Sequence, residues 1–182
     1  MEYLIYFYVY SFLGWVLETA YASIRLRRYC SKQTLLKSPL CPIYGIGAVL
    51  MLLLLSPDAA LLVFSGGFFL ASSVEYLVSA YYLHAFGIRR WNYTGSPGNV
   101  GGHVCAGYSI LWGIFALWLL YGLHPAVQSF VSRLDARLLS ITLLLLCVWV
   151  IQDFRDTKKE LKRYAAGEEN CIETKFSYVT KP

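Results

Sequence analysis

Apolar residues in this chain gather into five runs that are separated by polar connectors. A helix needs about 20 mostly apolar residues to cross roughly 30 Å of hydrocarbon. Four of the runs meet that test, and the run at residues 40–55 is shorter but rich in leucine. The pattern predicts an all-α, polytopic membrane protein with five transmembrane helices, at about residues 3–24, 40–55, 59–86, 105–123 and 138–152. Residues 1–153 then form a transmembrane helical domain, and residues 154–182 form a basic cytoplasmic tail.

The composition favours lipid over water as the main solvent of this chain. Hydrophobic residues make up 57% of the sequence, and the mean hydropathy is +0.50. The net charge of +5 does not indicate nucleic-acid binding, because the basic residues stand just beyond the apolar runs. Anionic membrane lipids are the expected partners there. Five cysteines without a C-x-x-C pair predict neither a disulfide framework nor a metal site, and no cofactor is expected.

Lysine and arginine alternate between the two sides that five spans define. Of the 16 basic residues, only Arg133 and Arg137 fall on one side, and the remainder fall in the first connector, the third connector and the tail. Because cytoplasmic segments carry the excess of Lys and Arg, the N-terminus is predicted outside and the C-terminus in the cytoplasm. With four or six spans, the basic residues would be separated less completely between the two sides of the membrane.

Two halves of the chain are similar to each other. Each half has a span with one acidic residue, a connector with basic and aromatic residues, and a second span that opens with C-x-x-Y. The corresponding residues are Glu18, Cys41 and Tyr44, and then Glu75, Cys105 and Tyr108. Both halves start on the same side, so the pattern predicts a parallel repeat of two helices. Chance similarity between apolar helices is the alternative, because the spacings differ.

Glu18 and Glu75 are the leading candidates for function, because each places a carboxyl group inside an apolar run. A charged group at membrane depth costs at least about 2.5 kcal/mol, so it should face other helices, pair with a cation or bind a proton. Small and polar residues at helical spacing predict an inward stripe on each helix: Ser11, Gly14, Glu18, Ala22 and Arg25, and Gly67, Ala71, Glu75 and Ser79. We expect a contact with a cation, a proton or a substrate there. In the structural alternative, Glu18 pairs with Arg25 or Arg28, and Glu75 accepts a hydrogen bond from a Tyr or Ser.

The second and fourth spans open with segments that contain helix breakers, at residues 41–47 and 98–105. Interrupted helices at matching positions are typical of transporter sites, and their free N–H groups could hold an anion. A first-turn proline and an ordinary glycine loop explain the same residues. The glycines lack the G-K-[ST] ending of a nucleotide-binding loop. Cys41, Cys105 and His103 could ligate a soft metal, but their spacing specifies none.

An ordered set of motifs resembles one known family. The set consists of S-F-L-G-W at residues 11–15 with Glu18, C-P-I-Y-G at 41–45, Glu75-Tyr76, Trp91-Asn92-Tyr93, and Asn99 with Cys105. Over about residues 3–125 the chain is similar to the putative ABC-transporter type IV (CmpB-like) family of small bacterial membrane proteins. The resemblance implies a permease-type role in the inner membrane of a bacterium. It adds two residues to the candidates for substrate or ion binding, which are then Glu18, Glu75, Tyr44, Tyr108, Asn99 and Trp15.

Two positions depart from the pattern of that family. Asn92 stands where the family usually has Asp, and His103 stands where it usually has Arg. If those two charges pair in relatives, a neutral contact between Asn92 and His103 is expected in this chain.

Three classes of function are consistent with the sequence. The leading hypothesis is a permease-like subunit, which requires a separate ATPase subunit if ATP drives it, and which is small enough to favour a homo-oligomer. The alternatives are a non-transporting interaction, sensor or assembly protein, and a membrane enzyme that uses Tyr44, Tyr108 and His103. No catalytic residue is assigned. A wet pocket shared by both carboxyls with Tyr44 and Tyr108 would favour transport, whereas a donor that caps each carboxyl in a dry bundle would weaken it.

Overall fold

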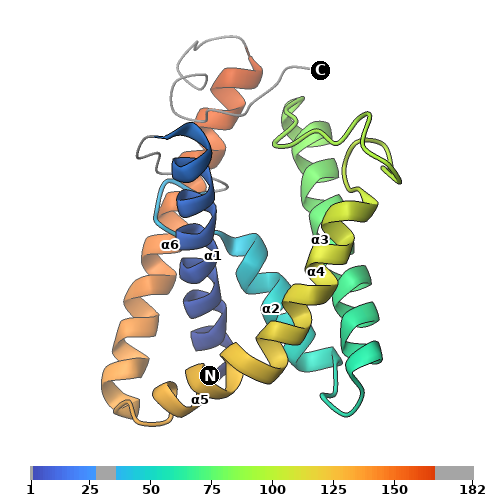
Figure 1. Cartoon of the computed structure of the whole chain (residues 1–182). Helices are drawn as coiled ribbons and strands as arrows, with labels where there is room; N and C mark the ends of the chain where they lie inside the picture. Colours follow the sequence, from blue (N-terminus) through green and yellow to red (C-terminus); the bar gives the residue numbers. More distant parts are fainter. Residues whose placement is uncertain (1, 28–35, 167–182) are drawn as a thin grey trace.

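The computed structural model describes residues 2–27 and 36–166, and Figure 1 shows their arrangement. They form α1 (Glu2–Leu26), α2 (Pro42–Leu54), α3 (Ala60–Phe86), α4 (Ala106–Trp118), a π-helical segment η1 (Leu119–Leu123), α5 (His124–Val131) and α6 (Ala136–Ala165). Because α4, η1 and α5 run on without a break, these elements make five helical rods. The all-α class is confirmed for the described residues. Arg28, Lys32 and the tail from residue 167 lie outside them.

The rods run alternately up and down, so their connectors collect at two ends of the molecule (Figure 1). One end, named the basic end below, holds the C-terminal end of α1, the loop at residues 87–105 and the C-terminal end of α6. The opposite end holds the N-terminus, the turn before α3 and the turn before α6. Arg133 lies at that opposite end, whereas Lys37, Arg89 and Arg90 lie at the basic end. This separation of charge follows the sequence pattern, and the assignment of the basic end to the cytoplasm stays a prediction.

Glycines allow close packing within two pairs of neighbouring helices. α1 packs mainly against α2, and α3 packs mainly against α4. A Cβ atom at Gly14 of α1 would overlap the Tyr44 ring of α2, and a Cβ atom at Gly67 of α3 would overlap the Ala116 side chain of α4. Small residues let helix backbones approach this closely. Two successive pairs are what the predicted repeat requires, although any bundle of antiparallel helices contains such pairs.

The predicted end of the fourth span at residue 123 is wrong, because the helix continues through η1 and α5 to Val131. A proline inside a helix lacks an N–H group, and its ring clashes with the carbonyl four residues earlier. The i→i+5 hydrogen bonds of the π-helical turn at residues 119–123 widen the backbone just before Pro125, and the helix can therefore continue. The continuation places Nδ1 of His124 2.9 Å from the Tyr10 hydroxyl of α1.

Polar contacts join α6 to the connector that precedes α2. The carboxyl of Asp153 accepts hydrogen bonds from the backbone N–H groups of Lys37 (3.2 Å) and Ser38 (2.9 Å), an arrangement named the Asp153 clamp below. The side chains of Lys37 and Glu160 form an ion pair beside it. The predicted fifth span ends at residue 152, but α6 continues to Ala165, so the first part of the predicted tail is helical.

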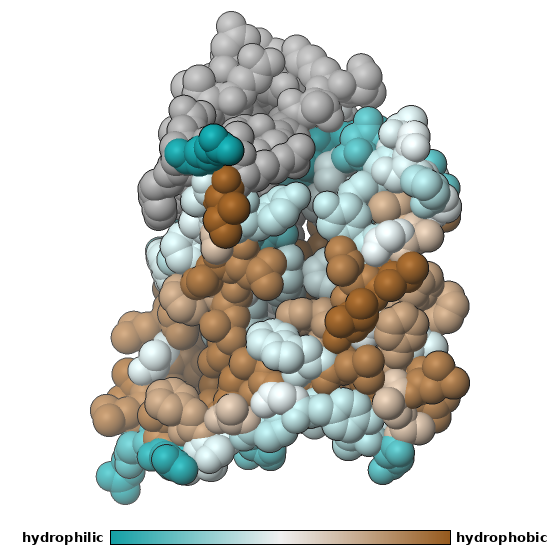
Figure 2. Space-filling view, viewed as in Figure 1, coloured by the Kyte–Doolittle hydropathy of each residue, from teal (hydrophilic) through white to brown (hydrophobic). Residues whose placement is uncertain are grey.

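Among the residues that the structure describes, three helical segments are long and apolar enough to cross a membrane: Ala60–Phe86, Ala106–Val131 and Arg137–Arg163. Only 22%, 22% and 11% of the residues in their most apolar windows are buried, so most of these side chains are at least partly exposed. Figure 2 shows them as a hydrophobic belt between two hydrophilic ends. Soluble monomers rarely expose an apolar surface of this extent. An exposed hydrophobic belt of this kind is expected of a membrane protein.

Two of the five predicted spans do not pass the same test. α2 has 13 residues, which gives a length of only about 20 Å. α1 has 25 residues, but five tyrosines and Glu18 reduce its hydropathy. The structure therefore supports the predicted spans for three of the five described rods by length and composition.

Candidate functional site

Glu75 lies on the buried face of α3, with 5% of its surface exposed. Gly67, Ala71 and Ser79 are also buried, so the stripe of small and polar residues faces the bundle as the four-residue spacing predicts. Glu75 precedes the last residue of α3, Phe86, by 11 positions. At 1.5 Å per residue, that distance is about 16 Å along the helix. The carboxyl is therefore deep in the bundle.

Two neutral donors hold the carboxyl of Glu75. The Tyr93 hydroxyl donates a hydrogen bond to Oε1 at 2.8 Å, and Nε1 of Trp112 donates one to Oε2 at 3.0 Å. Among the described residues no cation forms an ion pair with Glu75. Glu18, an acid, is the charged group close enough to act on it. Burial of a carboxylate without a cation is costly, so a proton, a bound ion or a charged ligand is needed to neutralise it.

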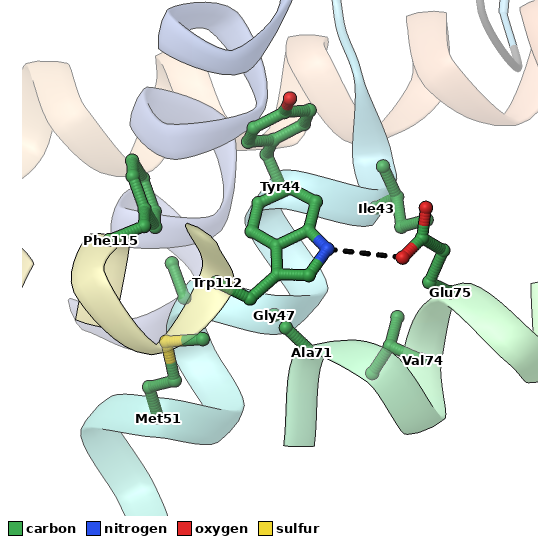
Figure 3. Close-up of a pocket in the computed structure, with 10 residues that line it drawn as sticks. Ile43, Tyr44, Gly47, Met51, Ala71, Val74, Glu75, Trp112 and Phe115 are labelled. Carbon is green, nitrogen blue, oxygen red and sulfur yellow. Dashed lines mark hydrogen bonds between the residues drawn. The ribbon is translucent and has the colours of Figure 1, made fainter. Parts of the chain in front are cut away.

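A cavity of about 20 Å³ lies beside Glu75, between α2, α3 and α4 (Figure 3). Most of its wall is aromatic or aliphatic, from Tyr44, Met51, Trp112 and Phe115 among others. The Trp112 ring forms one side and directs its N–H group toward the carboxyl (Figure 3). A water molecule needs roughly 10–15 Å³ of such volume. The cavity can therefore hold about one water.

Glu18 is half-buried on the other side of the same aromatic cluster. The Tyr44 hydroxyl donates a hydrogen bond to its Oε1 at 2.8 Å. The Tyr44 ring meets the Trp112 ring edge-on, with the centroids 5.3 Å apart. One pair of contacting rings therefore links the two carboxyl groups. The predicted pairing of Glu18 with Arg25 or Arg28 concerns side chains outside the described residues.

Tyr93 reaches Glu75 because the loop at residues 87–105 folds back over the end of α3. The Tyr93 N–H donates to the Gly102 carbonyl at 3.0 Å, which fixes the tyrosine within the loop. Gly101 and Gly102 have φ angles of 59° and 74°, which glycine adopts readily, and they turn the chain back toward α4. Burial and the charge of Glu75 raise the pKa of the Tyr93 hydroxyl, so it remains a hydrogen-bond donor.

His103 anchors this loop to α3. Its Nδ1 lies 2.7 Å from the Ser79 hydroxyl, in a buried contact. Burial and the charge of Arg89 lower the pKa of His103, so the neutral ring is favoured. Asn92 accepts hydrogen bonds from Thr94, within its own turn. The expected contact between Asn92 and His103 is therefore wrong, because each has another partner.

Tyr108 does not take the place beside Glu75 that Tyr44 takes beside Glu18. Its ring packs against the Tyr93 ring, with the centroids 4.9 Å apart, and Tyr93 itself bonds to Glu75. The equivalent positions of the predicted repeat therefore differ in their contacts.

Asn99 and Trp15 do not line the cavity. Asn99 accepts a hydrogen bond from the Gly102 N–H and donates one to the Ser96 carbonyl, so it shapes the loop. Trp15 stacks on Phe12 of the same helix, with the ring centroids 5.9 Å apart. Of the six candidates, the structure brings Glu18, Tyr44 and Glu75 into one cluster.

Each carboxyl is thus capped by a tyrosine, and no pocket shared by both is found among the described residues. The capping of each carboxyl weakens a transport interpretation, although the cavity beside Glu75 has space for about one water. The structural alternative, in which Glu75 accepts a hydrogen bond from a Tyr or Ser, is confirmed with Tyr93 as the donor. The sequence did not indicate which tyrosine it would be, and it did not indicate Trp112. Trp112 could have been found, because it lies one helical turn after Tyr108. Tyr93 lies in a connector without periodicity, where spacing gives no signal.

The openings of α2 and α4 show no further ligand cluster. Cys41 and Cys105 are buried and immediately precede the two helices, and neither forms a side-chain hydrogen bond that caps the helix. Within the described ranges no group of three or more His, Cys, Asp or Glu residues could hold a metal ion.

Comparison with known proteins identifies one family. The family model described as "Putative ABC-transporter type IV" matches residues 5–157, which is most of the chain. The resemblance expected from the motifs is therefore confirmed. No curated protein and no solved structure matches the chain.

Proposed function

The chain belongs to the putative ABC-transporter type IV family, and on that premise we propose that it is a permease-like membrane subunit that binds a proton or a cation at Glu75. The family and the three apolar helices support a membrane protein related to transport. The role of Glu75 is an inference from the geometry around its carboxyl.

One observation carries this proposal: a buried carboxyl in the bundle has neutral donors and an acidic neighbour, but no cation pairs with it in the part of the chain that the structure describes. Tyr93 and Trp112 stabilise the carboxylate without supplying a full positive charge. Glu18 adds a second negative group to the same cluster. Ionisable residues inside membranes are expensive and are therefore candidates for function. Such a site favours the uptake of a positive species.

The small cavity and the lack of a nucleotide-binding motif both indicate that transport would need partners or a change of conformation. The described helices enclose a cavity that holds about one water, so a pathway for a larger solute requires a change of conformation or a second copy. The sequence contains no nucleotide-binding G-x-x-x-x-G-K-[ST] motif. ATP-driven transport would therefore depend on a separate ATPase subunit, and a homo-oligomer is part of the same proposal.

Flux measurements in liposomes test the role of Glu75. The purified chain is reconstituted with an internal pH dye for proton flux or an internal Na⁺-sensitive dye for Na⁺ flux, and the flux is driven by a potassium diffusion potential. We expect flux above that of protein-free liposomes, and a loss of at least about tenfold in Glu75→Gln, because the amide cannot take up the charge. Asp58→Asn, which removes an exposed carboxyl in the turn before α3, is the matched control and should not change the flux. A wild-type flux equal to that of empty liposomes contradicts the proposal.

The capped carboxyls favour one alternative, a non-transporting interaction, sensor or assembly protein. In that case Glu75 and Tyr93 hold the loop at residues 87–105 in place. Glu75→Gln would then leave activity intact, whereas removal of the basic residues at the end of α6 and beyond would abolish it. The opposite pattern favours transport.

A further inference from the structure

We propose that the positive species bound at Glu75 is a proton, and that Tyr93 covers the carboxyl on the side of the basic end. This inference rests on the proposed function, and it names the ligand of Glu75 and its route of access.

The wall of the cavity favours a proton over a metal ion. Hard cations are bound by several oxygen ligands. Here Glu75 contributes a carboxyl, whereas Met51, Ala71, Val74 and Phe115 contribute carbon and sulfur. The cavity volume of about 20 Å³ leaves no space for a cation with its water shell. A proton needs neither additional ligands nor space, because it binds directly to one carboxyl oxygen.

Of the two donors to the carboxyl, Tyr93 is the one that can move away, because it belongs to a loop and not to a helix of the bundle. Trp112 of α4 lies on one side of the carboxyl, and residues of α2 line the cavity beside it. Tyr93 is only partly buried and bonds to Oε1 from the loop at residues 87–105. That loop is fixed to α3 by the Tyr93–Glu75 bond and the Ser79–His103 contact. Movement of Tyr93 would open Oε1 to the basic end without separating any helices.

The proton step itself is simple. When Tyr93 moves away, a water molecule reaches the protonated carboxyl of Glu75. The O–H bond of the carboxyl breaks, the proton forms a bond to the water to give hydronium, and the electron pair stays on the carboxylate. The reverse step reloads the site, and nothing is oxidised or reduced. The titratable groups that face Glu75 are Tyr93 of the loop, Glu18 of α1 and Tyr44 of α2.

Modification by a hydrophobic carbodiimide tests both parts of the proposal. Dicyclohexylcarbodiimide reacts with carboxyl groups in their protonated form, and mass spectrometry locates the product on the full-length chain in liposomes. At neutral pH we expect modification at Glu75 in the wild type and none at this position in Glu75→Gln. Tyr93→Phe keeps the ring but removes the hydroxyl, so the rate should rise about fivefold, the factor for one hydrogen bond.

Tyr121→Phe is the matched control for the loss of one tyrosine hydroxyl. The Tyr121 hydroxyl donates to the Pro57 carbonyl at 2.9 Å, at the opposite end of the molecule. We expect this variant to react at the wild-type rate. An equal rise in the modification rate in Tyr121→Phe and Tyr93→Phe would contradict the role of Tyr93 as a cover, because a general loss of stability would explain both results.

Two measurements on the wild type test the proton assignment without any variant. Replacing choline by Na⁺ at constant ionic strength should leave the rate unchanged, and protection by Na⁺ would overturn the assignment. Absence of modification in the folded chain, when the unfolded chain reacts at acidic pH, would also overturn it.

The proton site and the transport role can fail separately. If Glu75 is modified as expected but Glu75→Gln retains flux, the proton site stands and the transport role fails. If Na⁺ protects and flux depends on Glu75, the transport role stands and the proton assignment fails.

Discussion

Glycine at position 14 sets how closely Tyr44 can approach Glu18. The Tyr44 ring lies directly against the Gly14 backbone, in the space that a Cβ atom would occupy. From this position its hydroxyl reaches Glu18 at 2.8 Å, and its ring reaches Trp112. A residue without a side chain thus determines the geometry of the aromatic cluster between the two carboxyls.

Gly14→Ala should therefore destabilise the protein by about 1–3 kcal/mol, the usual range for overpacking. The Tyr44 ring has to move at its base, and not only at its tip, because the overlap includes the tyrosine Cβ. Gly47→Ala on α2 is the matched control, since nothing lies within 4 Å of the added methyl group. It should be neutral or stabilising by up to about 1 kcal/mol through helix propensity. Thermal unfolding in detergent measures both, and equal effects would argue against the close packing at Gly14.

At the scale of elements, the Asp153 clamp fixes α6 to the chain before α2. Its carboxyl accepts two backbone N–H groups, and Asp153 itself is buried. Charge-assisted hydrogen bonds in a buried site are among the stronger polar contacts. The neighbouring pair of Asp156 and Lys159 is exposed, with a separation of 4.0 Å, and such surface pairs contribute little.

Asp153→Asn should loosen this junction, because the amide cannot accept both bonds with a full charge. A loss of about 1.5–3 kcal/mol for a hydrogen bond to a charged group implies a rise of roughly 10–150-fold in local opening. Hydrogen exchange at the amides of Lys37 and Ser38 reports that opening. Asp156→Asn should leave their exchange unchanged. If both variants exchange alike, the clamp does not hold the connector.

The helices could be predicted from the sequence better than their junctions. Apolar runs are long and regular, so the rods and the inward face of α3 follow from spacing alone. The end expected at residue 123 fails because the π-helical turn lets the helix pass Pro125, and His124 then contacts Tyr10, 114 positions away. The bond from Tyr93 to Glu75 joins an irregular loop to a helix, and no periodic pattern encodes it. Both cases involve contacts between residues far apart in the sequence, which periodicity does not encode.

At the scale of the molecule, a hydrophobic belt lies between two hydrophilic ends (Figure 2). α6, with 30 residues, is about 45 Å long, which exceeds the roughly 30 Å of a hydrocarbon core. Its C-terminal part carries Arg155, Lys158 and Lys162. These charged residues lie beyond the hydrophobic belt, at the basic end. Anionic headgroups attract such residues. The expected orientation places this end in the cytoplasm.

Cysteine accessibility tests the orientation. In a background without the native cysteines, Asp58→Cys marks the turn before α3, and Lys162→Cys marks the end of α6. Both positions are exposed in the structure. An impermeant maleimide should modify Asp58→Cys in intact cells and Lys162→Cys only after permeabilisation, because the basic end faces inward. The reverse order of labelling would invert the topology and move the Tyr93 side of Glu75 to the exterior.

The π-helical turn at η1 has one further consequence, for changes of chain length. Such a turn contains one residue more than a regular helical turn needs. Deleting that residue would restore i→i+4 hydrogen bonding and leave α5 near its present rotation, so His124 would stay beside the rings of Tyr6 and Tyr10, which it now contacts. The widening before Pro125 would be lost, however, and the clash of the proline ring with the carbonyl four residues earlier would return. A change of one residue in length at this turn therefore acts on the fit of the proline and not on the rotational phase of α5.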